Sequence, residues 1–75
     1  MTILEAIHSA NDFLQRHTGF VADPDMARLV DRPGQGTYWQ VVYGFRHFFP
    51  DAKVVDDGDY TIEIDDRTGD VSYFG

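Results

Sequence analysis

Cysteine is absent from this chain of 75 residues, and basic side chains are scarce, with six lysines and arginines against thirteen aspartates and glutamates. Without cysteine the chain can form neither a disulfide framework nor a cysteine-rich zinc site. The net charge of −7 repels nucleic-acid phosphate and anionic lipid, so neither nucleic acid nor a membrane surface is expected as a partner. The sequence has no apolar run near the roughly 20 residues that a membrane span needs.

The N-terminal segment, MTILEAIHSANDFLQRH, lacks the basic leader, the apolar run and the small-residue cleavage site of a secretory signal. We therefore expect a cytoplasmic location. A chain this short buries only about 60% of the surface that its unfolded form exposes. A single domain over residues 1–75 with a thin core follows.

A helix is predicted from about Ile3, because Thr2 and Glu5 form a capping-box pattern at its start. Gly19 suits the left-handed position just beyond the helix end. The spacing places one apolar stripe on the helix: Ile3, Ala6, Ile7, Ala10, Phe13 and Leu14. Polar side chains fall on the opposite face: His8, Ser9, Asn11, Asp12, Gln15 and Arg16.

Residues 23–32 allow two interpretations. Asp23 and Pro24 can cap a short helix. Alternatively, residues 26–30 form a strand that the turn residues 33–36, Pro-Gly-Gln-Gly, bring back onto the following segment. The strand is favoured, because the next strand otherwise lacks a neighbour in sequence.

A long strand is predicted over residues 37–49, TYWQVVYGFRHFF, with Gly44 marking a bulge or bend. Its alternation presents one set of residues to the helix: Thr37, Trp39, Val41, Tyr43, Phe45, His47 and Phe49. The other set is mixed and typical of a solvated face: Tyr38, Gln40, Val42, Gly44, Arg46 and Phe48.

Two further strands are predicted near the C-terminus. Residues 60–65 alternate, with Tyr60, Ile62 and Ile64 on one face and Thr61, Glu63 and Asp65 on the other, and residues 71–74 form a last short strand. The expected fold class is α+β, with an N-terminal helix packed on one face of a three- or four-stranded antiparallel sheet.

The acidic C-terminal stretch, DDRTGDVSYFG, raises the question of a cation site. Calcium loops of the EF-hand kind need glycine at the sixth position and glutamate at the twelfth, between helices. Counting from either Asp57 or Asp65 fails that pattern. Residues 66–69 instead suit a tight turn closed by a left-handed glycine, with Asp66 capping the turn amides. No metal site and no cofactor are predicted.

Residues that could carry catalysis stand in no recognisable context. His8 and Asp12 are spaced to pair on one helical face, but no nucleophile lies near them. Ser9 and Ser72 lack a nucleophile elbow, and the glycines of residues 33–36 make no phosphate loop. The sequence therefore predicts that the protein is not an enzyme.

Aromatic residues and acidic charge are the most informative features. Eleven aromatic side chains occur, and residues 51–75 contain eight acidic but only two basic residues. One helix can cover only one face of a sheet, so aromatics on the other face are either candidates for contact with a partner or are buried by curvature of the sheet and by the connection at residues 50–58. We predict partner-binding residues of two kinds: the aromatic anchors Tyr38, Trp39 and Phe48, and the acidic residues Asp56, Asp57, Asp59, Asp65, Asp66 and Asp70.

Three segments together resemble a family. They are the helix with Ala6, Ala10, Phe13 and Leu14, the Tyr-Trp-Gln-Val run of residues 38–41, and residues 62–71 with their Thr-Gly turn. The layout resembles the small cystatin-like or nuclear-transport-factor-2-like immunity proteins of bacterial polymorphic toxin systems. It is also similar to PepSY-type modules, which restrain peptidases.

The immunity resemblance implies a non-catalytic module that occludes a basic partner, such as a toxin or an enzyme, through an acidic and aromatic surface. The PepSY resemblance implies a peptidase partner. A third hypothesis is a homo-oligomeric structural module, such as a homodimer, in which the second sheet face closes on its own copy.

Overall fold

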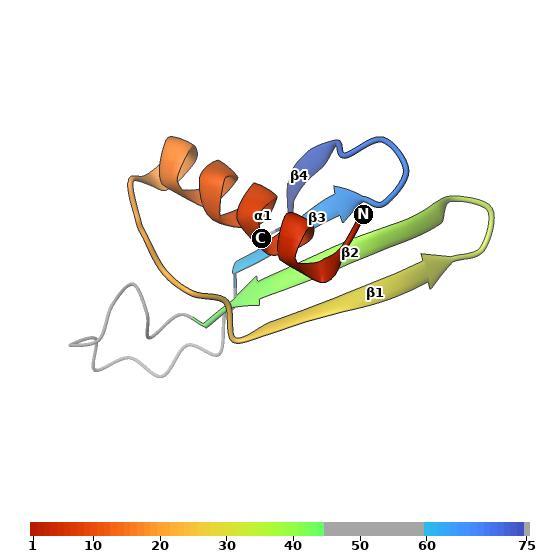
Figure 1. Ribbon diagram of the computed structural model, residues 1–75, viewed down its shortest axis with the longest axis horizontal. Helices are drawn as coiled ribbons and strands as arrows, with labels where there is room; N and C mark the ends of the chain where they lie inside the picture. The colour runs from red at the N-terminus through yellow and green to blue at the C-terminus, as the bar shows by residue number, and fades with distance from the viewer. Residues whose placement is uncertain (45–59, 75) are drawn as a thin grey trace.

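The structure, a computed structural model, describes residues 1–44 and 60–74 (Figure 1).

Helix α1, Ile3–Thr18, begins and ends as the capping signals predict. Thr2 Oγ1 accepts a hydrogen bond from the Glu5 amide at 3.2 Å, and the Glu5 carboxylate accepts one from the Thr2 amide at 2.9 Å. Gly19 ends the helix with φ of 78°, and its amide donates to the Gln15 carbonyl at 2.9 Å. Both helix ends are therefore fixed by local sequence.

The described residues form one antiparallel sheet of four strands, in the order β1-β2-β3-β4. Its strands are β1 (Met26–Arg32), β2 (Gly36–Tyr43), β3 (Tyr60–Asp65) and β4 (Val71–Phe74). In Figure 1, α1 lies over one face of the sheet and β1 forms an outer edge. The predicted α+β class, with one helix on a four-stranded antiparallel sheet, is confirmed.

The strand interpretation of residues 26–30 is confirmed by the β1–β2 hairpin. Pro33 fixes the second turn position, and Gly34, with φ of 79°, occupies the third, as a type II turn requires. The Gln35 amide closes the turn on the Arg32 carbonyl at 2.9 Å. At the other end of the hairpin, the Gly44 amide donates to the Asp25 carboxylate at 2.6 Å.

The long strand predicted over residues 37–49 can be followed only as far as Gly44. β2 runs over Gly36–Tyr43, and Gly44 follows outside the strand, where its amide donates to the Asp25 carboxylate. Residues 45–49 of the prediction lie outside the described residues.

The predicted turn between the last two strands is confirmed, but a different aspartate caps it. Gly69 has φ of 79°, and its amide donates to the Asp65 carbonyl at 2.8 Å. Asp65 Oδ1 accepts from the amides of Arg67 and Thr68 at 2.8 and 3.1 Å. The prediction gave this role to Asp66 and is wrong on that point, because the turn begins one residue earlier.

The core lies between α1 and the sheet face that α1 covers. It consists of Ala6, Ala10 and Leu14 from the helix with Val41, Tyr43, Ile62 and Ile64 from the central strands. Two alanines at the contact allow the helix backbone to approach the sheet closely. Ile3, assigned to the apolar stripe, is instead 45% exposed.

Asn11 corrects the predicted polar face of α1. The Tyr43 hydroxyl, at the bottom of the core, donates a hydrogen bond to Asn11 Oδ1. Asn11 is half-buried, so the buried stripe of the helix is displaced toward it. A buried tyrosine hydroxyl needs such a partner, and this need accounts for a polar residue at the contact.

Candidate functional site

The two described aromatic anchors of the predicted partner site lie on opposite faces of the sheet. Trp39 faces α1, is half-buried, and donates its indole N–H to Asp66 Oδ1 at 2.7 Å. Tyr38 faces the other way and donates its hydroxyl to the Gln35 carbonyl at 3.1 Å. Neighbouring strand residues point to opposite faces, so one flat surface cannot present both rings.

The remaining predicted aromatic anchor and three of the acids are not placed. Phe48, Asp56, Asp57 and Asp59 lie outside the described residues. The described acids of the predicted site are Asp65, Asp66 and Asp70, and all three belong to the β3–β4 hairpin or its turn.

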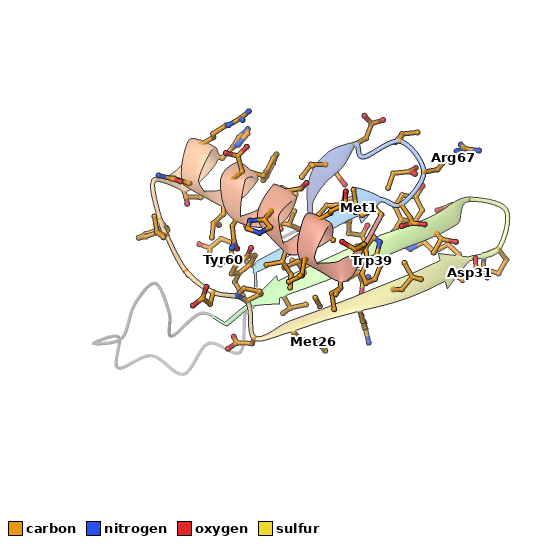
Figure 2. All side chains as sticks on the ribbon, viewed as in Figure 1. Met1, Met26, Asp31, Trp39, Tyr60 and Arg67 are labelled. Carbon is orange, nitrogen blue, oxygen red and sulfur yellow. The ribbon has the colours of Figure 1, made fainter. Side chains whose placement is uncertain are left out.

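Asp65 and Asp66 are held in place by the fold. Hydrogen bonds from the Thr68 and Arg67 amides lower the pKa of Asp65, so the carboxylate is favoured in its charged form. Asp66 Oδ1 binds the Trp39 indole and lies 3.4 Å from the α-amino nitrogen of Met1. Figure 2 shows Trp39 pointing from β2 toward the first turn of α1, near Met1. Both carboxylates make these contacts through Oδ1.

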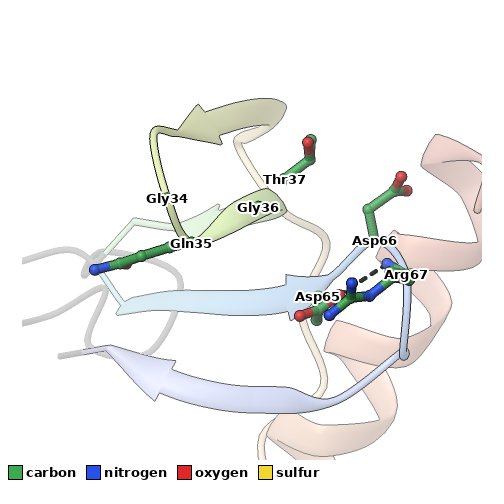
Figure 3. Close-up of a pocket in the computed structure, with 7 residues that line it drawn as sticks. All are labelled: Gly34, Gln35, Gly36, Thr37, Asp65, Asp66 and Arg67. Atoms are coloured by element: carbon green, nitrogen blue, oxygen red, sulfur yellow. Dashed lines mark hydrogen bonds between the residues drawn. The ribbon is translucent and has the colours of Figure 1, made fainter.

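A hollow of about 360 Å³ lies between the tip of the β1–β2 hairpin and the β3–β4 turn (Figure 3). Its lining is polar and rich in exposed backbone: Gly34, Gln35, Gly36, Thr37, Asp65, Asp66 and Arg67. Tyr38 follows Thr37 on β2 and is the register partner of Asp65 across β2 and β3, so it is next to two of these lining residues. We call the lining residues together with Tyr38 the hairpin-tip site.

A second hollow, of about 260 Å³, is apolar and lies between the last turns of α1 and strands β3 and β4. It is lined by Phe13, Leu14, His17, Thr18, Tyr60, Ile62 and Tyr73. His17 stacks on Phe13 with ring centroids 4.0 Å apart, and its Nδ1 lies 3.0 Å from the Phe13 carbonyl oxygen.

Groups that could hold a metal ion do not gather in the described parts of the chain, where no set of three or more His, Cys, Asp or Glu side chains converges. The Asp12 carboxylate, which the spacing allowed to pair with His8, binds Arg16 at 2.6 Å. His47 lies outside the described residues.

Within residues 1–44 and 60–74, no helix has the length and apolar character needed to cross a membrane.

The face opposite α1 contains a charged network that the sequence pattern did not predict. Glu63, which the alternation places on the face opposite Ile62 and Ile64, is only 5% exposed. Arg32 binds its carboxylate with both terminal nitrogens, the Nη1–Oε1 distance being 2.9 Å, and Gln40 Nε2 donates to Oε2 at 2.8 Å. Arg28 Nε donates in turn to Gln40 Oε1 at 2.8 Å. We call Arg28, Arg32, Gln40 and Glu63 the open-face network.

Strand register explains how these four residues meet. Arg28, Gln40 and Glu63 are direct register partners across β1, β2 and β3. Burial alone would raise the pKa of Glu63, but hydrogen bonds from Arg32 and Gln40 and the positive charge of Arg32 hold it below its ordinary value. The sequence contains the opposite charges of this network, but only the strand register shows that they lie on one face and next to each other.

Comparisons of this chain with protein-family models, with curated proteins and with solved structures find no match. The resemblance to immunity proteins therefore stays a hypothesis. The charge and geometry of the described residues are the basis for a functional proposal.

Proposed function

We propose that this chain is a non-catalytic protein-binding module of the immunity or inhibitor type, which occludes a basic protein partner through its acidic C-terminal part. The observation that carries the proposal is the charge distribution: residues 51–75 hold eight of the thirteen acidic side chains and only two basic ones. A surface field of one sign accelerates encounter with a partner of the opposite sign.

The hairpin-tip site is the part of the described surface best suited to receive a lysine or arginine side chain. Asp65 and Asp66 are positioned by the turn amides and by Trp39, and each leaves its second carboxylate oxygen for a further donor. Carboxylates fixed before binding lose little conformational freedom when a partner arrives. Asp70 is exposed on the same hairpin and adds to the field.

Tyr38 is the better placed of the two described aromatic anchors. It stands beside Asp65, is half-buried, and is held by Arg32, whose guanidinium carbon lies 5.2 Å from the ring centroid. A rigid aromatic ring beside fixed carboxylates can pack against the aliphatic stem of a basic side chain. Trp39, by contrast, supports Asp66 from the helix side.

The surface can be tested by following backbone amide signals during titration of the full chain with a tetra-arginine peptide. We expect the largest shifts at residues 34–37 and 65–70 and a marked weakening between about 50 and 500 mM salt. Asp70→Asn should weaken binding, whereas Asp12→Asn, which removes the same charge from the outer face of α1, should have a smaller effect. Shifts spread evenly over the chain, or binding that salt does not change, would count against the proposal.

The partner is best sought as the basic product of a neighbouring gene. An immunity-type module should abolish that protein's activity at one-to-one stoichiometry, because occlusion is stoichiometric. A complex that leaves the partner fully active would rule out the inhibitor role while keeping the binding role.

A further inference from the structure

Among the strands of residues 1–44 and 60–74, β1 is the last on its side of the sheet, so its outer edge pairs with none of them. It is seven residues long and pairs with β2 through a continuous register with no bulge and no internal proline. Leu29 and Met26 on this strand are 51% and 44% exposed. Natural proteins protect edge strands with bulges, prolines, short length or outward charges, because an open edge pairs readily with another strand.

Two of the three charged residues of β1, its arginines, are directed along the sheet and do not shield the edge, and the third, Asp31, is exposed near its end. Arg28 and Arg32 turn inward along the sheet to Gln40 and Glu63, at 2.8 and 2.9 Å. Figure 1 shows β1 at the margin of the sheet, on the far side of β2 from β3 and β4. Leu29 is thus the large apolar side chain at the middle of an accessible edge.

The backbone groups that face outward can be assigned from a neighbouring hydrogen bond. The Thr37 carbonyl points to β3, because it accepts from the Asp66 amide at 3.0 Å. Its partner Asp31 therefore directs its own N–H and C=O away from β2, and alternation gives Leu29 and Ala27 the same direction. The backbone N–H and C=O groups of three alternate residues, Ala27, Leu29 and Asp31, therefore face outward, with Leu29 in the middle.

We propose that the β1 edge binds the β1 edge of a second copy of this chain, antiparallel and about a two-fold axis through Leu29. In this register the whole of β1 is paired, since Leu29 is the middle residue of Met26–Arg32. Leu29 lies opposite Leu29 of the second copy, and Ala27 lies opposite Asp31. The two sheets then continue into one another across the axis.

Charge favours this register of the self-paired strand over the neighbouring ones. With Leu29 on the axis, Arg28 faces Val30 of the second copy and Arg32 faces Met26, so no like charges lie directly opposite. Moving the axis to Arg28 opposes that arginine to itself, and moving it to Val30 opposes Arg28 to Arg32. Directly opposed like charges destabilise a strand pair. The strand can therefore pair with its own copy over its full length without placing like charges directly opposite one another.

The first experiment measures the solution mass of the full chain by light scattering, at concentrations up to about 1 mM. The expected mass at the upper end is twice the 8.6 kDa of one chain. Leu29→Lys places two ammonium groups opposite one another and should weaken the dimer about tenfold or more. Val21→Lys is the matched control, because Val21 is 82% exposed and lies outside β1.

The second experiment fixes the register. The chain has no cysteine, so Leu29→Cys introduces a single thiol. Hydrogen-bonded antiparallel partners have Cα atoms about 5.5 Å apart, which a disulfide spans. Under mild oxidation Leu29→Cys should cross-link into a covalent dimer much faster than Val21→Cys.

Three results would overturn the proposal: a monomeric mass at every concentration, a dimer that Leu29→Lys leaves unchanged, or equal cross-linking rates for the two cysteine variants. The proposal does not depend on a basic partner. Loss of tetra-arginine binding in Asp70→Asn and loss of the dimer in Leu29→Lys are separate outcomes, so either proposal can fail alone.

Discussion

The two faces of the sheet bury their central residues by different means. Under α1, Ile62 and Ile64 are fully buried against helix side chains. Between them in sequence, Glu63 is 5% exposed on the other face, where Arg32 and Gln40 bind its carboxylate. Three successive residues of β3 are thus nearly equally buried, two by an apolar layer and one by a charged network.

The difference shows what a small sheet needs on the face that α1 leaves uncovered. An apolar face is stabilised by removal of its surface from water, which requires a covering element. A face without such an element can still exclude water from a charged group if neighbouring strands supply its hydrogen-bond partners. The open-face network is therefore a local arrangement that depends on register, whereas the core depends on helix docking.

The largest expected effect is from removing an apolar side chain under the helix. Ile62→Ala should destabilise the protein by about 2–5 kcal/mol, because Ile62 is fully buried and its loss leaves a cavity. Chemical denaturation followed by circular dichroism measures the change. Leu4→Ala, at a side chain that is 65% exposed, is the control and should stay within about 0.5 kcal/mol of the unmodified protein.

A smaller effect is expected from the polar contact inside the same core. Tyr43→Phe should cost about 1 kcal/mol at neutral pH, because it leaves the Asn11 carbonyl without its donor. Burial raises the pKa of Tyr43 to about 12 from 10.0. Between these two pH values the Tyr43 hydroxyl is deprotonated in the unfolded state but still protonated in the folded state, so the free energy of unfolding should fall as pH rises. Tyr43→Phe lacks this hydroxyl, so its stability should fall less. Urea denaturation of the unmodified protein and of Tyr43→Phe at pH 8 and about 11 measures the difference.

The open face should control the acid side of the stability profile. The pKa of Glu63 is lowered in the folded protein from 4.5, so the stability it contributes is present above that value and is lost as pH falls through the folded pKa. Glu63→Gln should flatten this loss in thermal melts from pH 6 to about 3. Each variant is a control for the other. Glu63→Gln should leave the dependence of stability on alkaline pH unchanged, and Tyr43→Phe should leave the dependence on acid pH unchanged.

The smallest effect is expected at the outer end of the open-face network. Arg28 is exposed and reaches the network only through Gln40. Arg28→Gln should change the free energy of unfolding by less than about 0.5 kcal/mol. A larger loss of unfolding free energy, measured by chemical denaturation, would mean that all four residues of the network stabilise one another across β1, β2 and β3, and not only the pairs that contact Glu63.

Local signals in the sequence were sufficient for most of the fold. The capping box at Thr2 and Glu5, the Pro-Gly turn at residues 33 and 34, and Gly69 each depend on neighbours within a few residues, and each was predicted. The alternation of residues 60–65 correctly assigned Ile62 and Ile64 to the core. Such features follow from backbone chemistry that any fold must satisfy.

Tertiary features could not be predicted in the same way. Burial of Glu63 requires Arg32, which is distant in sequence and meets it through the register of three strands. Asn11 appears polar on a helical wheel, and only the depth of Tyr43 explains its inward position. The predicted partner site grouped Tyr38 with Trp39, but strand alternation places these neighbouring residues on opposite faces of the sheet.

A double-mutant cycle on Arg32 and Glu63 tests most directly whether the open face is held by a paired charge. Arg32→Met alone should destabilise the protein, because it leaves the buried Glu63 carboxylate without its main partner. We expect the double variant Arg32→Met, Glu63→Met to lose much less stability than the two single variants together. Single losses that simply add would contradict the paired charge and would mean that the two side chains contribute independently.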